Sequence, residues 1–189
     1  ETGGDYYDFI VINDAAEQKL GVAIGDVCGH GNPSALLMAT VRSSLRQRAS
    51  MPGSTAKIIT DVNRQLVQDI EDSGQFMTIF FLAFTTESRQ LEWVRAGPDP
   101  AIFYDPELDK FDELHGTGMA LGVDAGYRHR VYRARPLAAG HLIAVGTDGV
   151  RGRANSELTA SFALGLGRAA ARVLGADIAP LANEGSNGR

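Results

Sequence analysis

One segment constrains the fold of this chain more than any other: a nearly continuous apolar run at residues 76–84, with sequence FMTIFFLAF. Its length and its aromatic and β-branched residues indicate a strand, and its lack of polar alternation indicates that both faces of this strand are buried. Such a strand needs a further layer on each side. A chain of 189 residues with 44% hydrophobic content is long enough to build one core of this kind.

The segments before this run predict a hairpin followed by two helices. A turn at Asn13 and Asp14 separates two stretches with strand-like composition, and Asp26 follows the second of them. Apolar residues then recur at helical spacing, Met51-Pro52-Gly53 interrupts the pattern, and Ser54 is suited to cap the next helix. The expected elements are strands at 6–12 and 20–24 and helices at 33–50 and 54–71.

The segments after the run predict more strands around a glycine-punctuated loop at 116–122. Strands, then helices, then strands joined by short turns indicate an α+β fold with antiparallel sheets in one domain, residues 1–189. The chain opens within a strand pattern, so we expect it to be a fragment of a longer protein. Strands are expected at 90–96, 101–104, 128–134, where the pattern alternates, and 141–145, where the pattern indicates burial. A helix is expected at 156–174 and a disordered tail at 183–189.

Charge and cysteine content exclude several classes of protein. The net charge is −5 and the pI is about 5.3, which argues against nucleic acid as a ligand because phosphate backbones require a basic surface. No apolar run approaches the roughly 20 residues that cross a bilayer, so no membrane association is expected. Cys28 is the single cysteine and forms no internal disulfide, which favours a reducing cytoplasm.

Three aspartates share one kind of setting: Asp5, Asp26 and Asp148 each lie next to glycine at the end of an expected strand. A carboxylate buried there is costly unless a cation meets it. Oxygen ligands of this type suit Mg²⁺ or Mn²⁺. The alternative for each aspartate alone is a turn or helix cap, and periodicity does not show that the three converge.

The motifs that contain these aspartates resemble a known family. Five motifs follow one another in its order: Gly3-Gly4-Asp5-Tyr6-Tyr7-Asp8, Gly25-Asp26-Val27-Cys28-Gly29-His30-Gly31, Phe76-Met77-Thr78, Gly118-Met119-Ala120-Leu121-Gly122 and Thr147-Asp148-Gly149-Val150. Together they resemble the PPM-type (type 2C) protein serine/threonine phosphatases of the bacterial SpoIIE/RsbU branch. The resemblance implies a two-layer antiparallel β-sandwich flanked by helices, in αββα order, with two divalent cations, Mn²⁺ or Mg²⁺.

The same resemblance implies roles for individual residues, with Asp5, Asp26 and Asp148 as the catalytic carboxylates. Asp26 would bridge both metals, the Val27 carbonyl would bind one, Asp148 would hold the second, and Asp5 would approach the first. A water made acidic by the ions would attack phosphoserine or phosphothreonine. Cys28 is then a packing residue. His30 is either a general acid for the leaving oxygen or a residue that fixes its turn, and we favour the second.

The resemblance also implies a hydrolase in signal transduction, within a partner-switching or stress-response pathway. Its substrate would be a phosphorylated anti-sigma-factor antagonist, and an upstream sensor or receiver domain would control it. At Ala176-Asp177, however, alanine occupies the position where the family carries a metal-binding aspartate. The alternative is therefore a pseudophosphatase that binds a partner without turnover. A domain acting on small phosphate esters is a less favoured third reading.

Overall fold

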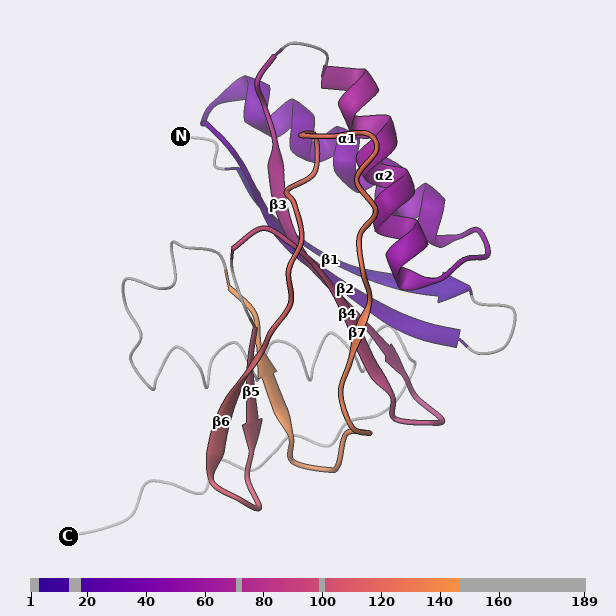
Figure 1. Cartoon of the computed structure of the whole chain (residues 1–189), viewed down its shortest axis with the longest axis vertical. Helices are drawn as coiled ribbons and strands as arrows, with labels where there is room; N and C mark the ends of the chain where they lie inside the picture. Colours follow the sequence, from indigo (N-terminus) through magenta and orange to yellow (C-terminus); the bar gives the residue numbers. More distant parts are fainter. Residues whose placement is uncertain (1–3, 14–17, 71–72, 99–100, 147–189) are drawn as a thin grey trace, which may run out of the picture.

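The computed structural model describes residues 4–13, 18–70, 73–98 and 101–146. These residues form two antiparallel sheets and two helices (Figure 1). The five-stranded sheet has the order β1-β2-β3-β4-β7 and the three-stranded sheet has the order β6-β5-β8. The elements are β1 (Asp5–Asn13), β2 (Gln18–Val27), α1 (Asn32–Ala49), α2 (Thr55–Ile70), β3 (Met77–Thr85), β4 (Leu91–Ala96), β5 (Ala101–Asp105), β6 (Lys110–Leu114), β7 (Tyr132–Arg133) and β8 (Leu142–Ala144).

Strand β3 lies at the centre of the five-stranded sheet, between β2 and β4. One face of β3 contributes Ile79 and Phe81 to a core shared with the helices, and the other contributes Phe80 and Leu82 to a core shared with the second sheet. The expected burial on both faces is therefore confirmed. The predicted α+β class and its antiparallel sandwich are confirmed as well.

Both helices lie on one face of the five-stranded sheet (Figure 1). Helix α2 buries the apolar stripe that its sequence predicts, and Lys57 N–H donates to the Ser54 hydroxyl at 3.3 Å, as expected for a capping serine. In α1 the apolar stripe runs through Leu37, Val41 and Leu45, whereas Leu36 is largely exposed. Helical periodicity therefore gives the position of α1 but does not by itself identify its buried face.

The hairpin differs from its prediction in one respect that concerns the site. Asp26 was expected just past the end of the second strand, but β2 continues through Val27. The ladder extends further because Val27 N–H donates to the Gly4 carbonyl and Cys28 N–H donates to the Phe76 carbonyl. Asp26 is thus held between two neighbouring strands.

The predictions for the second half of the chain agree less well with the structure. Strand β6 was not expected, because its sequence is mostly polar and only Leu114 is buried. The alternating segment at 128–134 forms only the two-residue strand β7. Strand β8 is shorter than the expected 141–145 and, contrary to prediction, is not fully buried, since Leu142 lies at the surface.

Two further expectations concern other parts of the chain. The helix at 156–174 and the tail at 183–189 lie outside the described residues. Neither of the two helices that the structure describes is long and apolar enough to cross a membrane.

Candidate functional site

Asp5 and Asp26 meet at one end of the β1–β2 ladder, where they are direct cross-strand partners. The Val27 N–H donates to the Gly4 carbonyl at 3.1 Å, which makes Gly4 and Val27 a hydrogen-bonded pair. Asp5 and Asp26 are therefore the adjacent non-hydrogen-bonded pair, whose side chains lie closest together. Two of the three aspartates singled out in the sequence are brought together by the fold.

This pair of carboxylates is suited to a divalent cation. Like charges directly opposite each other destabilise a sheet, and a bound cation offsets that repulsion. Carboxylate oxygens are the ligands that Mg²⁺ prefers. Within the described residues, no three His, Cys, Asp or Glu side chains group as a metal site. Asp148, the third expected ligand, lies outside those residues.

Gly4 brings the two strands into unusually close contact beside the pair. A Cβ at this position would lie 2.6 Å from the Val27 carbonyl oxygen and 2.9 Å from Asp26 Oδ1. Both oxygens are expected metal ligands, so glycine leaves open the space in which they lie. The residues present therefore fit the cation that the fold implies.

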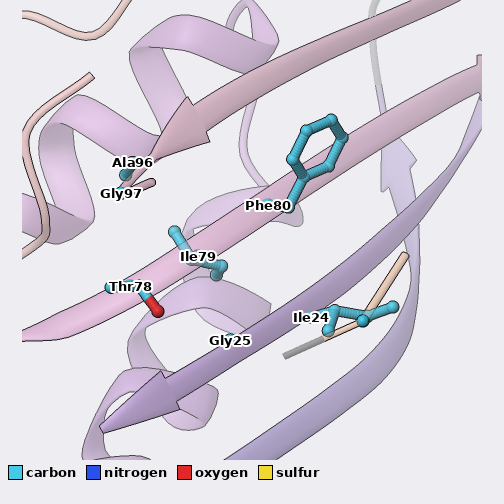
Figure 2. Close-up of a pocket in the computed structure, with 8 residues that line it drawn as sticks. Ile24, Gly25, Thr78, Ile79, Phe80, Ala96 and Gly97 are labelled. Atoms are coloured by element: carbon cyan, nitrogen blue, oxygen red, sulfur yellow. The ribbon is translucent and has the colours of Figure 1, made fainter. Parts of the chain in front are cut away.

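A small pocket begins next to Asp26. It is lined by residues from the ends of β2, β3 and β4 and by Gly146, and Figure 2 shows Ile24, Thr78 and Gly97 on its walls. Asp26 is the cross-strand partner of Thr78. The pocket is thus lined by Gly25 and Thr78, the chain neighbour and the cross-strand partner of Asp26. Gly146, which also lines it, stands two residues before Asp148 in the sequence.

The glycine loop at 116–122 borders the pocket. Gly97 N–H donates to the Gly118 carbonyl at 3.1 Å, and Leu121 forms an isolated bridge with Met77. The Arg95 side chain donates to the carbonyls of Gly97 and Gly116. These contacts hold the loop along β3 and β4. That the loop borders the site stays a prediction.

Asp8 lies on the opposite face of β1. It is buried, and it accepts hydrogen bonds from Arg46 Nε at 2.6 Å and from the Tyr6 hydroxyl at 3.1 Å. Burial alone raises the pKa of this carboxyl, but the hydrogen bonds from Arg46 and Tyr6 outweigh it and hold the pKa below its ordinary value. Asp8 therefore fastens α1 to the sheet and does not face the aspartate pair.

Cys28 and His30 follow the aspartate pair along the chain. The Cys28 sulfur accepts a hydrogen bond from Phe76 N–H at 3.2 Å, and this contact is consistent with the expected packing role. His30 is exposed between Gly29 and Gly31, both of which have positive φ. Gly31 then precedes α1 as its N-cap, without a side-chain cap. The role of His30 stays a prediction.

Sequence reasoning assigned no individual role to Gly4, Thr78 or Gly97, although Gly4 and Thr78 lie in two of the motifs that carry the resemblance. A signal existed for Thr78, because it is the one hydroxyl in the apolar run at 76–84. Gly97 has a φ of 135°, and a Cβ there would lie 2.7 Å from Thr78 Cβ. The close approaches at Gly4 and Gly97 arise between distant segments and leave no local sequence signal.

Comparisons with known proteins agree with this architecture. The phosphoserine phosphatase RsbU of Bacillus subtilis (strain 168) is 26% identical over 150 residues, which cover 79% of this chain and 43% of RsbU. The chain spans less than half the length of the curated relatives it matches. The PP2C phosphatase domain of SpoIIE from Bacillus subtilis has a similar fold, with a TM-score of 0.67 at 17% identity over 79% of this chain and 42% of that one.

A second solved structure, RsbX in complex with magnesium, has a TM-score of 0.64 at 17% identity and covers 86% of this chain and 73% of that one. PP2C-type phosphatases are metal-dependent, in agreement with the expected divalent cations. A family model described as Stage II sporulation protein E (SpoIIE) matches residues 16–176, most of the chain. The chain therefore belongs to the SpoIIE family and has the fold of PP2C-type phosphatase domains.

Proposed function

We propose that this domain hydrolyses phosphoserine or phosphothreonine on a regulatory protein, with Asp5, Asp26, Asp148 and the Val27 carbonyl as ligands of two divalent cations. The observation that carries the proposal is the direct pairing of Asp5 with Asp26 beside the Val27 carbonyl. Two carboxylates and a backbone oxygen at one sheet edge make a hard oxygen site that suits Mn²⁺ or Mg²⁺.

Asp148 is the third proposed carboxylate ligand, and it is included because of its position in the sequence. Gly146 lines the pocket with Thr78 and Gly97, and two residues of chain reach at most about 7 Å. Asp148 stands two residues beyond Gly146 in the sequence, and this short separation supports its place among the proposed ligands. Its role stays a prediction.

In the proposed reaction, the chain's own residues bind the two cations and hold them in position. The bound ions would supply an acidified water as nucleophile and offset the phosphate charge. The water oxygen bonds to phosphorus as the bond from phosphorus to the serine oxygen breaks, which gives inorganic phosphate and a free hydroxyl. The carboxylates of Asp5, Asp26 and Asp148 would hold these ions.

The substrate and the setting rest on the family resemblance. We propose a phosphorylated anti-sigma-factor antagonist as substrate, in a partner-switching pathway of the cytoplasm. An upstream sensor or receiver domain would control the activity. Comparing hydrolysis of such a phosphoprotein with hydrolysis of small phosphate esters tests this choice, since fast turnover of the esters alone would contradict it.

The alternative is a pseudophosphatase, favoured by Ala176 at the position where the family carries a ligand; Ala176 and Asp177 lie outside the described residues. The test is hydrolysis of p-nitrophenyl phosphate with Mn²⁺, measured for the wild type and Asp26→Ala. Asp69→Ala, a change of an exposed aspartate on α2, is the matched control. A hydrolysis rate that requires both Mn²⁺ and Asp26 supports the enzyme. If no such rate is measured, the result favours the pseudophosphatase that binds a partner.

A further inference from the structure

Thr78 is the hydroxyl residue directly across the β2–β3 ladder from Asp26. Along the same face of β3 it is followed by Phe80 and Leu82, which pack into the core between the sheets. A threonine here interrupts an apolar face at the point where the pocket begins.

The hydroxyl is directed at the main chain of β2. Thr78 Oγ1 donates to the Asp26 carbonyl oxygen at 3.5 Å. On the other side of the same peptide group, Val27 N–H donates to the Gly4 carbonyl at 3.1 Å. Cys28 and Phe76 form a hydrogen-bonded pair, so Asp26 and Thr78 are the next such pair of this ladder, and the Asp26 carbonyl also accepts the Thr78 main-chain N–H. The peptide plane between Asp26 and Val27 is thus held from β3 on one side, with the Thr78 hydroxyl as a second donor, and from β1 on the other.

This peptide plane joins the two proposed ligands of β2. A peptide group is planar and ends at the two Cα atoms, so holding it steadies the backbone from which the Asp26 side chain and the Val27 carbonyl extend. Gly97 supports the arrangement from the other side of Thr78, because a Cβ at Gly97 would lie 2.7 Å from Thr78 Cβ. The missing side chain leaves Thr78 the space it occupies.

We propose that Thr78 is a positioning residue of the metal centre: its hydroxyl adds a second bond from β3 to the peptide plane from which the Asp26 carboxylate and the Val27 carbonyl extend. The inference rests on the proposed function, since it requires these two groups to bind a cation. Thr78 acts through β2 and does not itself bind the ion. Its loss therefore weakens metal binding before any substrate is present.

The test measures the Mn²⁺ concentration that gives half of the maximal rise in melting temperature. Thr78→Val keeps the shape of the side chain and removes the hydroxyl, so we expect about twofold more Mn²⁺ to be needed, the weak end of the range for one hydrogen bond because the donor lies 3.5 Å away. Thr78→Ser keeps the donor and should match the wild type. Thr85→Val, at the far end of β3, is the control for the substitution itself.

Each outcome decides the inference. A Thr78→Val midpoint equal to that of Thr85→Val overturns it, as does a Thr78→Ser midpoint shifted as far as that of Thr78→Val. If Thr78→Val does not fold, Thr78→Ala replaces it, judged against Thr78→Ser by the same criterion. A wild type that binds Mn²⁺ but hydrolyses no phosphoprotein removes the proposed function alone, because the metal titration still measures the role of Thr78.

Discussion

Asp5 and Asp26 are direct partners on two antiparallel strands, as the adjacent non-hydrogen-bonded pair beside Gly4 and Val27. This arrangement brings two carboxylates as close as neighbouring strands allow. The pair is unfavourable for the metal-free sheet and favourable for binding a divalent cation. The stability of the domain should therefore respond to metal in a way that depends on both residues.

Asp5→Asn tests this relationship without changing side-chain size. In EDTA the variant should melt a few degrees above the wild type, because relief of the opposed charges contributes up to about 1 kcal/mol. In Mn²⁺ the order should reverse, since the variant lacks a ligand. Thermal melting in both buffers measures this, with the exposed Asp69→Asn as control. An equal metal-induced rise in Asp5→Asn and the wild type would contradict the assignment of Asp5.

Gly4→Ala tests the space around the expected ligands. The new Cβ would meet the Val27 carbonyl oxygen at 2.6 Å and Asp26 Oδ1 at 2.9 Å, so one strand end must shift. We expect about tenfold weaker Mn²⁺ binding by calorimetry, because such overpacking costs about 1–3 kcal/mol. Gly126→Ala is the control, since its nearest neighbour is the movable end of the Asp124 side chain at 3.3 Å. Unchanged binding in Gly4→Ala would place the metal elsewhere.

Asp8→Asn tests the ion pair between Asp8 on β1 and Arg46 on α1, which links the helix to the sheet. The pKa of Asp8 is depressed in the folded state, so its contribution to stability is present above the unfolded value of about 3.9 and is lost as pH falls through the folded pKa. At pH 7 the variant should lose about 2 kcal/mol of unfolding free energy, less than for a fully buried pair because Arg46 is half exposed.

Urea denaturation from pH 7 to pH 3 measures this difference, which should shrink below about pH 4 as the wild type loses the same charge. Asp112→Asn removes the exposed pair with Lys110 and should change stability by less than about 1 kcal/mol. A difference between Asp8→Asn and the wild type that stayed constant down to pH 3 would show that charge on Asp8 is not the cause.

His129→Gln tests a pH effect at the glycine loop. His129 is buried with Nε2 at 3.0 Å from the Met119 carbonyl oxygen. Among the described residues, its Nδ1 is the single buried side-chain nitrogen or oxygen without a hydrogen-bond partner. Burial lowers the pKa of His129, and the hydrogen bond to Met119 opposes this only in part. The folded state therefore holds the neutral ring.

Below the unfolded pKa of about 6.5, the unfolded chain binds a proton that folded His129 does not, so stability should fall as pH decreases from 6.5. His129→Gln should reduce that slope in denaturation curves between pH 7 and pH 5. His115→Gln, which changes an exposed histidine, should leave it unchanged. Equal slopes in wild type and His129→Gln would rule out this source of pH dependence.

The sequence by itself determined the layers of the fold. The apolar run at 76–84 required cover on both faces, and the structure provides it with helices on one side and a second sheet on the other. The 3.6-residue period of α2 identified its buried face correctly, because period and burial coincide in a strongly amphipathic helix. Strand β6 was not predicted, because its mostly polar sequence has neither an apolar run nor a regular apolar period.

Only the tertiary structure decided which aspartates share a site. Asp5 and Asp8 lie on one strand, yet Asp5 pairs with Asp26 and Asp8 with Arg46. The alternation of side chains along β1 is local and readable from sequence, but the register with β2 depends on contacts between separate segments. A slip of one residue would move Asp26 to the other face of the sheet, so the pairing of the carboxylates follows from the packing of the whole domain.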